Sequence, residues 1–289
     1  MKNKRKAISE NVMRGIFLIS ACVCVLAVGM ICLFLFANGL PFFTKYPLGD
    51  FLGGVKWAPS KEIFGIMPMI IGSFVITLGA VLLAAPVGLL TAVFMVFFAG
   101  DRVRKWMEPA VALLAGIPSV VYGFFGLMLL VPLTAEVFDI SAGNSILVAS
   151  VLLSIMILPT IIQTSQAALG AVPKNYYEGS VALGATHEHA VMHAMMPAAR
   201  SGIVSGFVLG MGRAIGETTA VIMVAGNQPR MPKGILKGIR TLTVNIIMEM
   251  GYAADVHAES LIATGVVLFV IVLSINIIFS YLNRRRVIQ

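Results

Sequence analysis

Arg213 and Glu217 are two charged residues inside an apolar stretch that is long enough to cross a bilayer. A charge at the centre of a membrane helix costs about 2.5–3.5 kcal/mol on insertion scales, so such residues mark a functional site and call for a partner. On a continuous helix, a spacing of four residues places both side chains on the same face. We therefore predict an Arg213–Glu217 pair, either a structural ion pair that fixes helix packing or part of a pathway for an anion.

The chemistry of this pair favours an anion shaped like phosphate or carboxylate. The planar guanidinium of Arg213 can donate two parallel hydrogen bonds to such a group. Glu217 would hold Arg213 in place and lower its affinity for the anion, so that the anion can leave. The chain has no G-x-x-x-x-G-K-[ST] motif to cradle ATP phosphates, and no Ser-His-Asp or paired-carboxylate arrangement. We expect a non-catalytic chain without a cofactor of its own.

Three histidines lie close together in the sequence, at positions 187, 189 and 193. Their spacing does not place all three on one helical face. His189 and His193 could share a face, as in some metal sites, but no carboxylate or cysteine completes a convincing ligand set. We expect surface or packing histidines and no metal.

The elements that must position these residues are membrane helices. Apolar residues make up 58% of the 289-residue chain and charged residues 12%, against roughly 25% charged residues in a typical soluble domain. About 20 apolar residues span the hydrocarbon core as a helix, and no β-barrel alternation is present. We predict an all-α, polytopic membrane protein with six transmembrane helices. The expected spans are about 15–37, 66–98, 109–134, 143–165, 200–226 and 259–282.

Basic residues predict the orientation of these spans. They gather in the N-terminal tail 1–14, in the loop after the second span and in the C-terminal tail 283–289, and the positive-inside rule places such segments in the cytoplasm. The net charge of +8 therefore points to topology and not to nucleic acid. The apolar stretch 16–37 exceeds a signal-peptide core, so we expect it to be kept as the first span. Both termini and the loop 166–199 are expected on the cytoplasmic side.

Small residues on the fifth span predict close helix packing. Gly202, Gly206 and Gly210 recur every fourth residue, followed by Gly212 and Gly216. Small residues at this spacing let helix backbones approach closely. We expect one face of this helix to pack against a partner helix while another face carries the charges.

The loop 166–199 reads as a helix, a turn and a second helix lying at the membrane surface. A proline at 173 starts a short amphipathic helix, and Gly184 can end it in the left-handed conformation. The loop resembles the E-A-A–x3–G–x9–I–x–L–P loop of ABC-importer permeases, although two alanines and the Ile and Leu are replaced. In that family the loop docks on the ATPase subunit. The docking residues that the resemblance implies here are Glu178, Gly179, Ser180, Ala182, Gly184 and Pro197.

A wider resemblance covers most of residues 40–282. The stretches "AGIPSVVYGFFGL" and "GMGRAIGET", with Trp57-Ala58-Pro59 before Phe64-Gly65-Ile66, are similar to the C-type permease of phosphate-specific (Pst) importers. The resemblance implies a type I ABC-importer permease in a bacterial cytoplasmic (inner or plasma) membrane. It implies an A-type permease partner in a heterodimer, with membrane lipids around the two permeases, a cytoplasmic ATPase dimer that binds ATP and Mg, and an extracytoplasmic phosphate-binding protein. It assigns Arg213 and Glu217 to the passage of inorganic phosphate.

Other functions remain open from the residues alone. Near alternatives are permeases for molybdate, sulfate or phosphonate. A secondary anion transporter would not need the docking loop, and a structural membrane subunit would have no pathway. The basic loop 230–240 lies on the side assigned as extracytoplasmic, either as a solvated loop of mixed charge or as a positive surface that attracts an anion or a docking partner.

Overall fold

The chain is built almost entirely of helices. A computed structural model describes the backbone of residues 2–287 and the side chains of residues 12–281. Most basic residues of the two predicted tails are not among those whose side chains are described. They are Lys2, Lys4, Arg5, Lys6, Arg284, Arg285 and Arg286. The five long helices are α1 (Lys2–Gly39), α4 (Met67–Val93), α8 (Ile146–Gly170), α12 (Arg200–Gly216) and α15 (Asp255–Val287).

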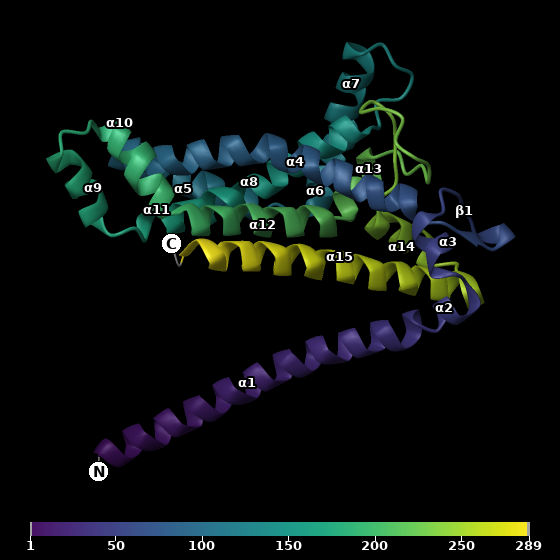
Figure 1. Ribbon diagram of the computed structural model, residues 1–289, viewed down its shortest axis with the longest axis horizontal. Coiled ribbons are helices and arrows are strands. Elements are labelled where there is room, and N and C mark those ends of the chain that lie inside the picture. The colour runs from purple at the N-terminus through teal and green to yellow at the C-terminus, as the bar shows by residue number, and fades with distance from the viewer. Residues whose placement is uncertain (1, 288–289) are drawn as a thin grey trace.

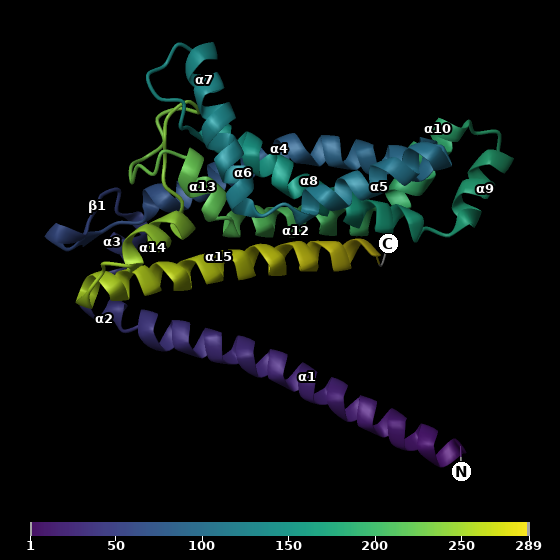
Figure 2. The same cartoon turned by 180° about the vertical axis from the view of Figure 1, so that it is seen from behind.

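Shorter elements gather at the two ends of these helices. One end carries α9 (Lys174–Ala182), α10 (His187–Ala190) and α11 (Met196–Ala198), and we call it the α9 end (Figure 1). The opposite, α14 end carries α2 (Phe42–Lys45), α3 (Leu48–Gly53), β1 (Trp57–Ala58), β2 (Ile63–Phe64), α13 (Thr219–Val224) and α14 (Leu242–Met250). The two strands pair antiparallel with Trp57 opposite Phe64. Both the start of α1 and the end of α15 lie toward the α9 end (Figure 2).

The described helices confirm a polytopic membrane protein. Among the described residues, five segments are long and apolar enough to cross a bilayer, and there are six if residues 187–198 and 200–216, which are bent by 68° at their junction, count as one span. The five are 12–45, 67–98, 119–137, 146–170 and 255–281. The predicted first and last spans are therefore parts of longer helices.

The third predicted span is wrong in its extent. The sequence predicts one helix over 109–134, but the structure has α5 (Asp101–Gly116), then a break, then α6 (Ser119–Phe125). Proline disfavours a helical conformation of the residue before it, and Ile117, before Pro118, is extended with φ −69° and ψ 126°. A π-helical turn at 126–130 and α7 (Val131–Val137) complete the membrane segment. The part before the break belongs to a helix with charged residues in its first half.

The core of the bundle lies where α4, α8 and α12 run side by side (Figure 1). Glycines on α12 allow this approach to α8. A Cβ at Gly202 would lie 2.4 Å from the Ala168 side chain, and one at Gly206 would lie 3.1 Å from Thr164. Such spacing lets the two backbones approach more closely than larger side chains would permit.

The glycine pattern of α12 divides into two parts. A Cβ at Gly210 would also face α8, 3.2 Å from the Ile161 side chain, whereas a Cβ at Gly212 or Gly216 would meet no neighbouring segment within 4 Å. Gly212 and Gly216 therefore do not pack closely against another helix among the described residues. Small residues are spread around α12, and only the Gly202–Gly210 row points at α8.

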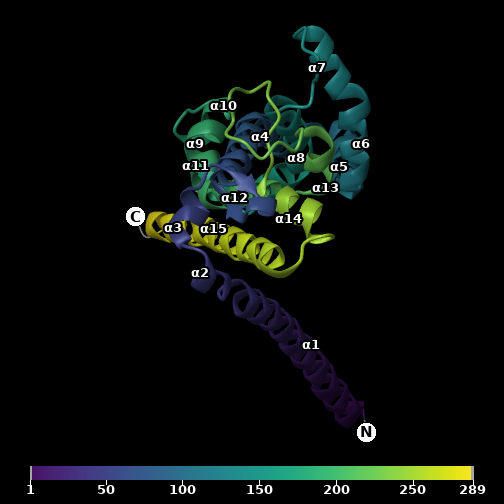
Figure 3. The same cartoon turned by 90° about the vertical axis from the view of Figure 1, so that its right-hand side faces the viewer.

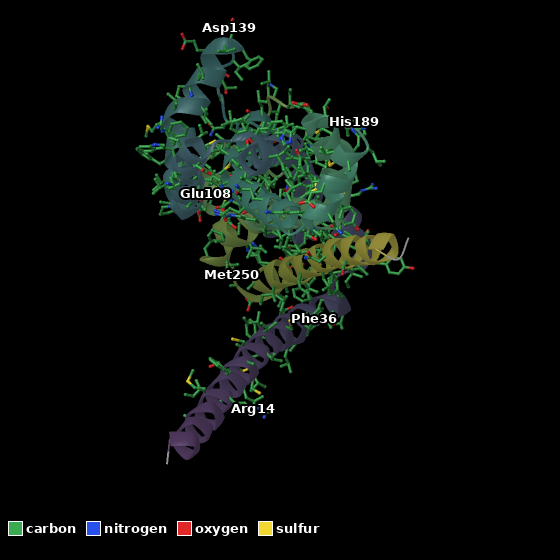
Figure 4. All side chains as sticks on the ribbon, turned by 90° about the vertical axis from the view of Figure 1, so that its left-hand side faces the viewer. Arg14, Phe36, Glu108, Asp139, His189 and Met250 are labelled. Carbon is green, nitrogen blue, oxygen red and sulfur yellow. The ribbon has the colours of Figure 1, made fainter. Side chains whose placement is uncertain are left out.

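Helix α1 diverges from the rest of the molecule. It contacts α15 near the α14 end, where Phe36 packs edge-on against Phe269 and Gly39 approaches Val266. Figure 3 shows α1 leaving the bundle, and Figure 4 shows Phe36 near α15 and Arg14 on the diverging part. Most of its apolar surface is exposed, as expected for a helix that faces lipid or another protein chain.

Candidate functional site

The fifth predicted span is broken at the residue expected to pair with Arg213. Helix α12 ends at Gly216, and Glu217 is extended with φ −71° and ψ 126°. The rule that residues four apart share a face holds only for a continuous helix. The expected Arg213–Glu217 ion pair is not formed, because none of the ion pairs within 4.0 Å among the described side chains includes either residue.

Glu217 instead holds the break together. Its Oε1 accepts the N–H of Ala220 at 3.1 Å, which satisfies one of the free N–H groups at the start of α13. Its backbone carbonyl accepts the hydroxyl of Thr243, at the start of α14, at 3.3 Å. Glu217 therefore links α13 and α14 at the end of α12.

Arg213 lies in the last turn of α12 with an exposed side chain. A charge within a membrane segment faces a bundle interior, a water-filled cavity or another subunit. No carboxylate of the described chain forms an ion pair with it.

The docking residues predicted from the sequence lie together at the α9 end. Glu178, Gly179, Ser180 and Ala182 are on α9, which has no buried residue. Gly184 follows with φ +89°, the left-handed conformation expected where glycine ends a helix. Figure 2 shows α9 standing off the bundle. Such an exposed helix is available to a partner.

Pro197 lies in α11, directly before the 68° bend that leads into α12. It is near the start of that short helix, where proline's missing N–H costs nothing. The predicted break therefore lies at the bend between residues 187–198 and α12.

The three histidines of this loop differ from one another. His187 is partly buried and has hydrogen-bond partners at both ring nitrogens, Tyr177 and Phe97. His189 and His193 are exposed and stack on each other with ring centroids 4.1 Å apart. Figure 4 shows His189 at the outer edge of the loop. Among the described residues, no group of three His, Cys, Asp or Glu side chains could hold a metal ion.

Sequence reasoning missed a buried charged cluster at the α14 end. Arg240, which the sequence places in a solvated or anion-attracting basic loop, is only 9% exposed and ion-paired with Glu249, which is 6% exposed. The guanidinium also donates to the backbone carbonyl of Asn227 at 3.0 Å and to the side chain of Asn245 at 2.9 Å. The basic side chains of this loop that are exposed are Arg230, Lys233 and Lys237.

The second oxygen of Glu249 joins two further segments to this cluster. It accepts the indole N–H of Trp57 in β1 at 2.9 Å and lies 2.9 Å from Nε2 of His257 in α15. A buried carboxylate needs several such donors to offset its desolvation. No spacing rule predicts this cluster, because its members come from three separate parts of the sequence.

This architecture is that of a type I ABC-importer permease, an all-α membrane protein with an exposed docking loop. The chain belongs to the family "Binding-protein-dependent transport system inner membrane component", whose model matches residues 84–288. The family implies a separate ATPase and a substrate-binding protein as partners.

Comparison with individual relatives shows which members of this family the chain resembles. The chain is 38% identical to the probable ABC transporter permease protein YqgH of Bacillus subtilis (strain 168), over 94% of this chain and 91% of that protein. It is 33% identical to the probable phosphate transport system permease protein PstC of Methanocaldococcus jannaschii, over 87% and 86%. It is 30% identical to PstC of Mesorhizobium japonicum, over 98% and 92%. The predicted resemblance to C-type permeases of phosphate importers is confirmed.

Solved structures show the same fold at low sequence identity. The inward-facing MetNI methionine ABC transporter matches with a TM-score of 0.63 and 18% identity, over 80% of this chain and 99% of that one. A bacterial importer of the acidic polysaccharide alginate matches with a TM-score of 0.64 and 15% identity, over 96% and 98%. These likenesses establish the fold.

Proposed function

We propose that this chain forms half of the pathway of an ATP-driven importer for inorganic phosphate. The observation that carries the proposal is Arg213, an exposed guanidinium at a helix break within a membrane segment, without a carboxylate partner in the described chain. The similarity to PstC proteins supports phosphate as the anion. A guanidinium matches the geometry of phosphate oxygens.

The proposed assembly has four kinds of protein chain. This permease pairs with an A-type permease, and the pathway runs between the two. A cytoplasmic ATPase dimer, which binds ATP and Mg, docks on α9, and an extracytoplasmic phosphate-binding protein docks at the α14 end. The α9 end then faces the cytoplasm, together with both termini and the basic residues Arg102, Arg104 and Lys105 at the start of α5, in keeping with the positive-inside rule.

The proposed cycle uses the differential binding of ATP to two states of the complex. Closure of the ATPase dimer moves α9, and the bend at Pro197 passes this motion to α12. The pathway opens toward the binding protein, and phosphate moves past Arg213. Hydrolysis of ATP then reverses the change and releases phosphate to the cytoplasm. Glu217 contributes by shaping the break that leaves Arg213 exposed, not by pairing with it.

A permease for another oxyanion is the nearest second candidate, since the relative of highest identity named above is described only as a probable ABC transporter permease. Sulfate, molybdate and phosphonate offer similar oxygens to a guanidinium. The test is ATP hydrolysis by the reconstituted complex in vesicles, with each anion offered to its extracytoplasmic side. Stimulation by phosphate, and not by the other anions, supports the proposal.

A matched pair of substitutions tests the pathway itself. Arg213→Gln should abolish most phosphate uptake, whereas Arg200→Gln, at a likewise exposed arginine at the opposite end of α12, should leave uptake unchanged. Normal uptake by an assembled Arg213→Gln complex would sink the pathway proposal. Uptake without the ATPase would point to a secondary transporter instead.

A further inference from the structure

The docking helix α9 is weakly attached to the rest of the molecule. It has no buried residue, and its main contacts are with α10 and the π-helical turn at 191–195. The segment that follows it, Leu183–Thr186, contains Gly184 with its left-handed backbone. The two connections of α9 are short, residues 171–173 from α8 and 183–186 to α10, so few contacts fix its angle to the bundle.

One side chain spans the space between α9 and the membrane helices. Nδ1 of His187 lies 2.8 Å from the hydroxyl of Tyr177 on α9, and Nε2 lies 3.1 Å from the backbone carbonyl of Phe97. A carbonyl can only accept, so Nε2 carries the proton and donates. In the neutral ring Nδ1 then accepts the hydroxyl proton of Tyr177. Both partners are satisfied by a single neutral tautomer.

The carbonyl of Phe97 belongs to the end of α4, where a π-helical turn at 94–98 extends the helix. Carbonyls in the last turn of a helix lack intrahelical partners and are free to accept a hydrogen bond from elsewhere. The ring of Phe98 packs against the His187 ring with centroids 4.9 Å apart. Since α4 packs along α8 and α12, a contact at this point reaches the core of the bundle.

The contact lies beside an open cavity of about 550 Å³ between the end of α4, the end of α8 and α9. Its lining includes Lys174, Tyr177, Glu178 and His187. The cavity leaves room for α9 to change its angle to the bundle. The hydrogen bonds of His187 cross this region and resist such a change.

We propose that His187 is a positioning residue that fastens the docking helix α9 to the end of α4, so that movement of α9 is transmitted to the helix bundle. This role rests on the docking of an ATPase at α9 proposed above. His187 connects Tyr177 on α9 to the carbonyl of Phe97 at the end of α4. This connection does not depend on the turn at Gly184. His189 and His193 do not take part, because they contact each other and not α4.

The test measures coupling in the reconstituted complex of both permeases, the ATPase and the binding protein. The quantity is phosphate taken up per ATP hydrolysed. His187→Ala should lower this ratio by about tenfold, and Tyr177→Phe should lower it by about threefold, because each removes part of the same hydrogen-bonded link. The matched controls, His189→Ala and His193→Ala, should keep the wild-type ratio.

Combined and conservative variants separate positioning from folding. The double variant Tyr177→Phe/His187→Ala should be no worse than His187→Ala alone, since one link is broken only once. His187→Gln keeps an N–H donor for the carbonyl of Phe97 and should recover part of the ratio. Should His187→Ala fail to assemble, Tyr177→Phe decides the question, because it removes only a hydroxyl group.

An unchanged ratio in assembled His187→Ala and Tyr177→Phe complexes would overturn the proposal, as would an equal loss in His189→Ala. The wild-type complex separates this outcome from a failure of the proposed function. If ATP hydrolysis responds to another oxyanion, the phosphate assignment fails, and the ratio measured with that anion still tests His187. If the wild-type chain binds no ATPase, the docking role fails and this proposal fails with it.

Discussion

The molecule contains two arginine–glutamate couples that behave in opposite ways. Arg213 and Glu217 are four residues apart and do not pair, whereas Arg240 and Glu249 are nine apart and form a buried ion pair. The first couple lies across a helix break, where the backbone turns Glu217 toward α13. The second is brought together by a loop and by α14. Proximity in the sequence therefore predicts pairing only where the helix is continuous.

The two couples also differ in what their charges are available to do. Glu249 accepts hydrogen bonds from Trp57, Arg240 and His257, so this cluster holds β1, α14 and α15 together. The guanidinium of Arg213 is exposed and has no carboxylate partner among the described side chains. The buried Arg240–Glu249 pair stabilises the α14 end, and Arg213 is the charge that we propose to bind the anion. Substitutions that separate stability from transport test this contrast.

The largest effect on stability is expected from Glu249→Ala. The change removes the carboxylate that pairs with the buried charge of Arg240 and accepts the indole N–H of Trp57, and breaking a buried pair costs about 3–5 kcal/mol. Thermal unfolding of the purified complex in detergent should show a marked loss.

The double variant Arg240→Met/Glu249→Leu checks the cause of this loss. Removing both charges avoids an uncompensated buried ion, so most of the stability should return. A double variant as unstable as Glu249→Ala would show that the ion pair is not what makes Glu249 important.

The second effect is on transport. Arg213→Gln should reduce uptake by about ten- to hundredfold, since hydrogen bonds to charged groups contribute about 1.5–3 kcal/mol. The free energy of unfolding should change by less than about 0.5 kcal/mol, because the exposed side chain has no ion-pair partner to lose. Uptake and unfolding measured on the same preparation give both values. A large loss of stability with normal uptake would reverse the contrast between the couples.

A smaller effect on stability is expected at Glu217. Glu217→Ala removes the acceptor of the Ala220 N–H and should cost about 0.5–2 kcal/mol, the usual range for a lost helix cap. Glu217→Gln keeps a side-chain oxygen for this hydrogen bond and should be close to wild type. Unfolding of the two variants side by side distinguishes a capping role from a charge role. An equal loss in both would indicate that the negative charge matters after all.

The smallest effect is expected at an exposed ion pair near the same end of the molecule. Lys45 lies 2.7 Å from Glu259, and the two side chains are 50% and 30% exposed. Exposed pairs contribute about 0–1 kcal/mol, so Glu259→Ala should change stability far less than Glu249→Ala. Comparable losses from the two substitutions would show that burial does not set the difference.

Several features follow from the sequence because they depend on local properties. The length and apolar character of each run predict membrane helices, and Gly184 predicts the left-handed end of α9. The break between α5 and α6 could also have been predicted, from the proline at position 118 in an otherwise charge-free run. The break at Glu217 has no proline or left-handed glycine of its own and could not.

The sequence by itself determined that the chain lies in a lipid bilayer, that it is helical and that the loop 166–199 is exposed. Bilayer thickness and the need to satisfy backbone hydrogen bonds constrain each segment independently. Only the tertiary structure decided which charges are paired, which histidine bridges α9 and the end of α4, and which glycines face α8. These outcomes depend on approaches between segments as far apart as Trp57 and Glu249. Such approaches arise from the packing of the whole bundle, and neither residue spacing nor composition records them.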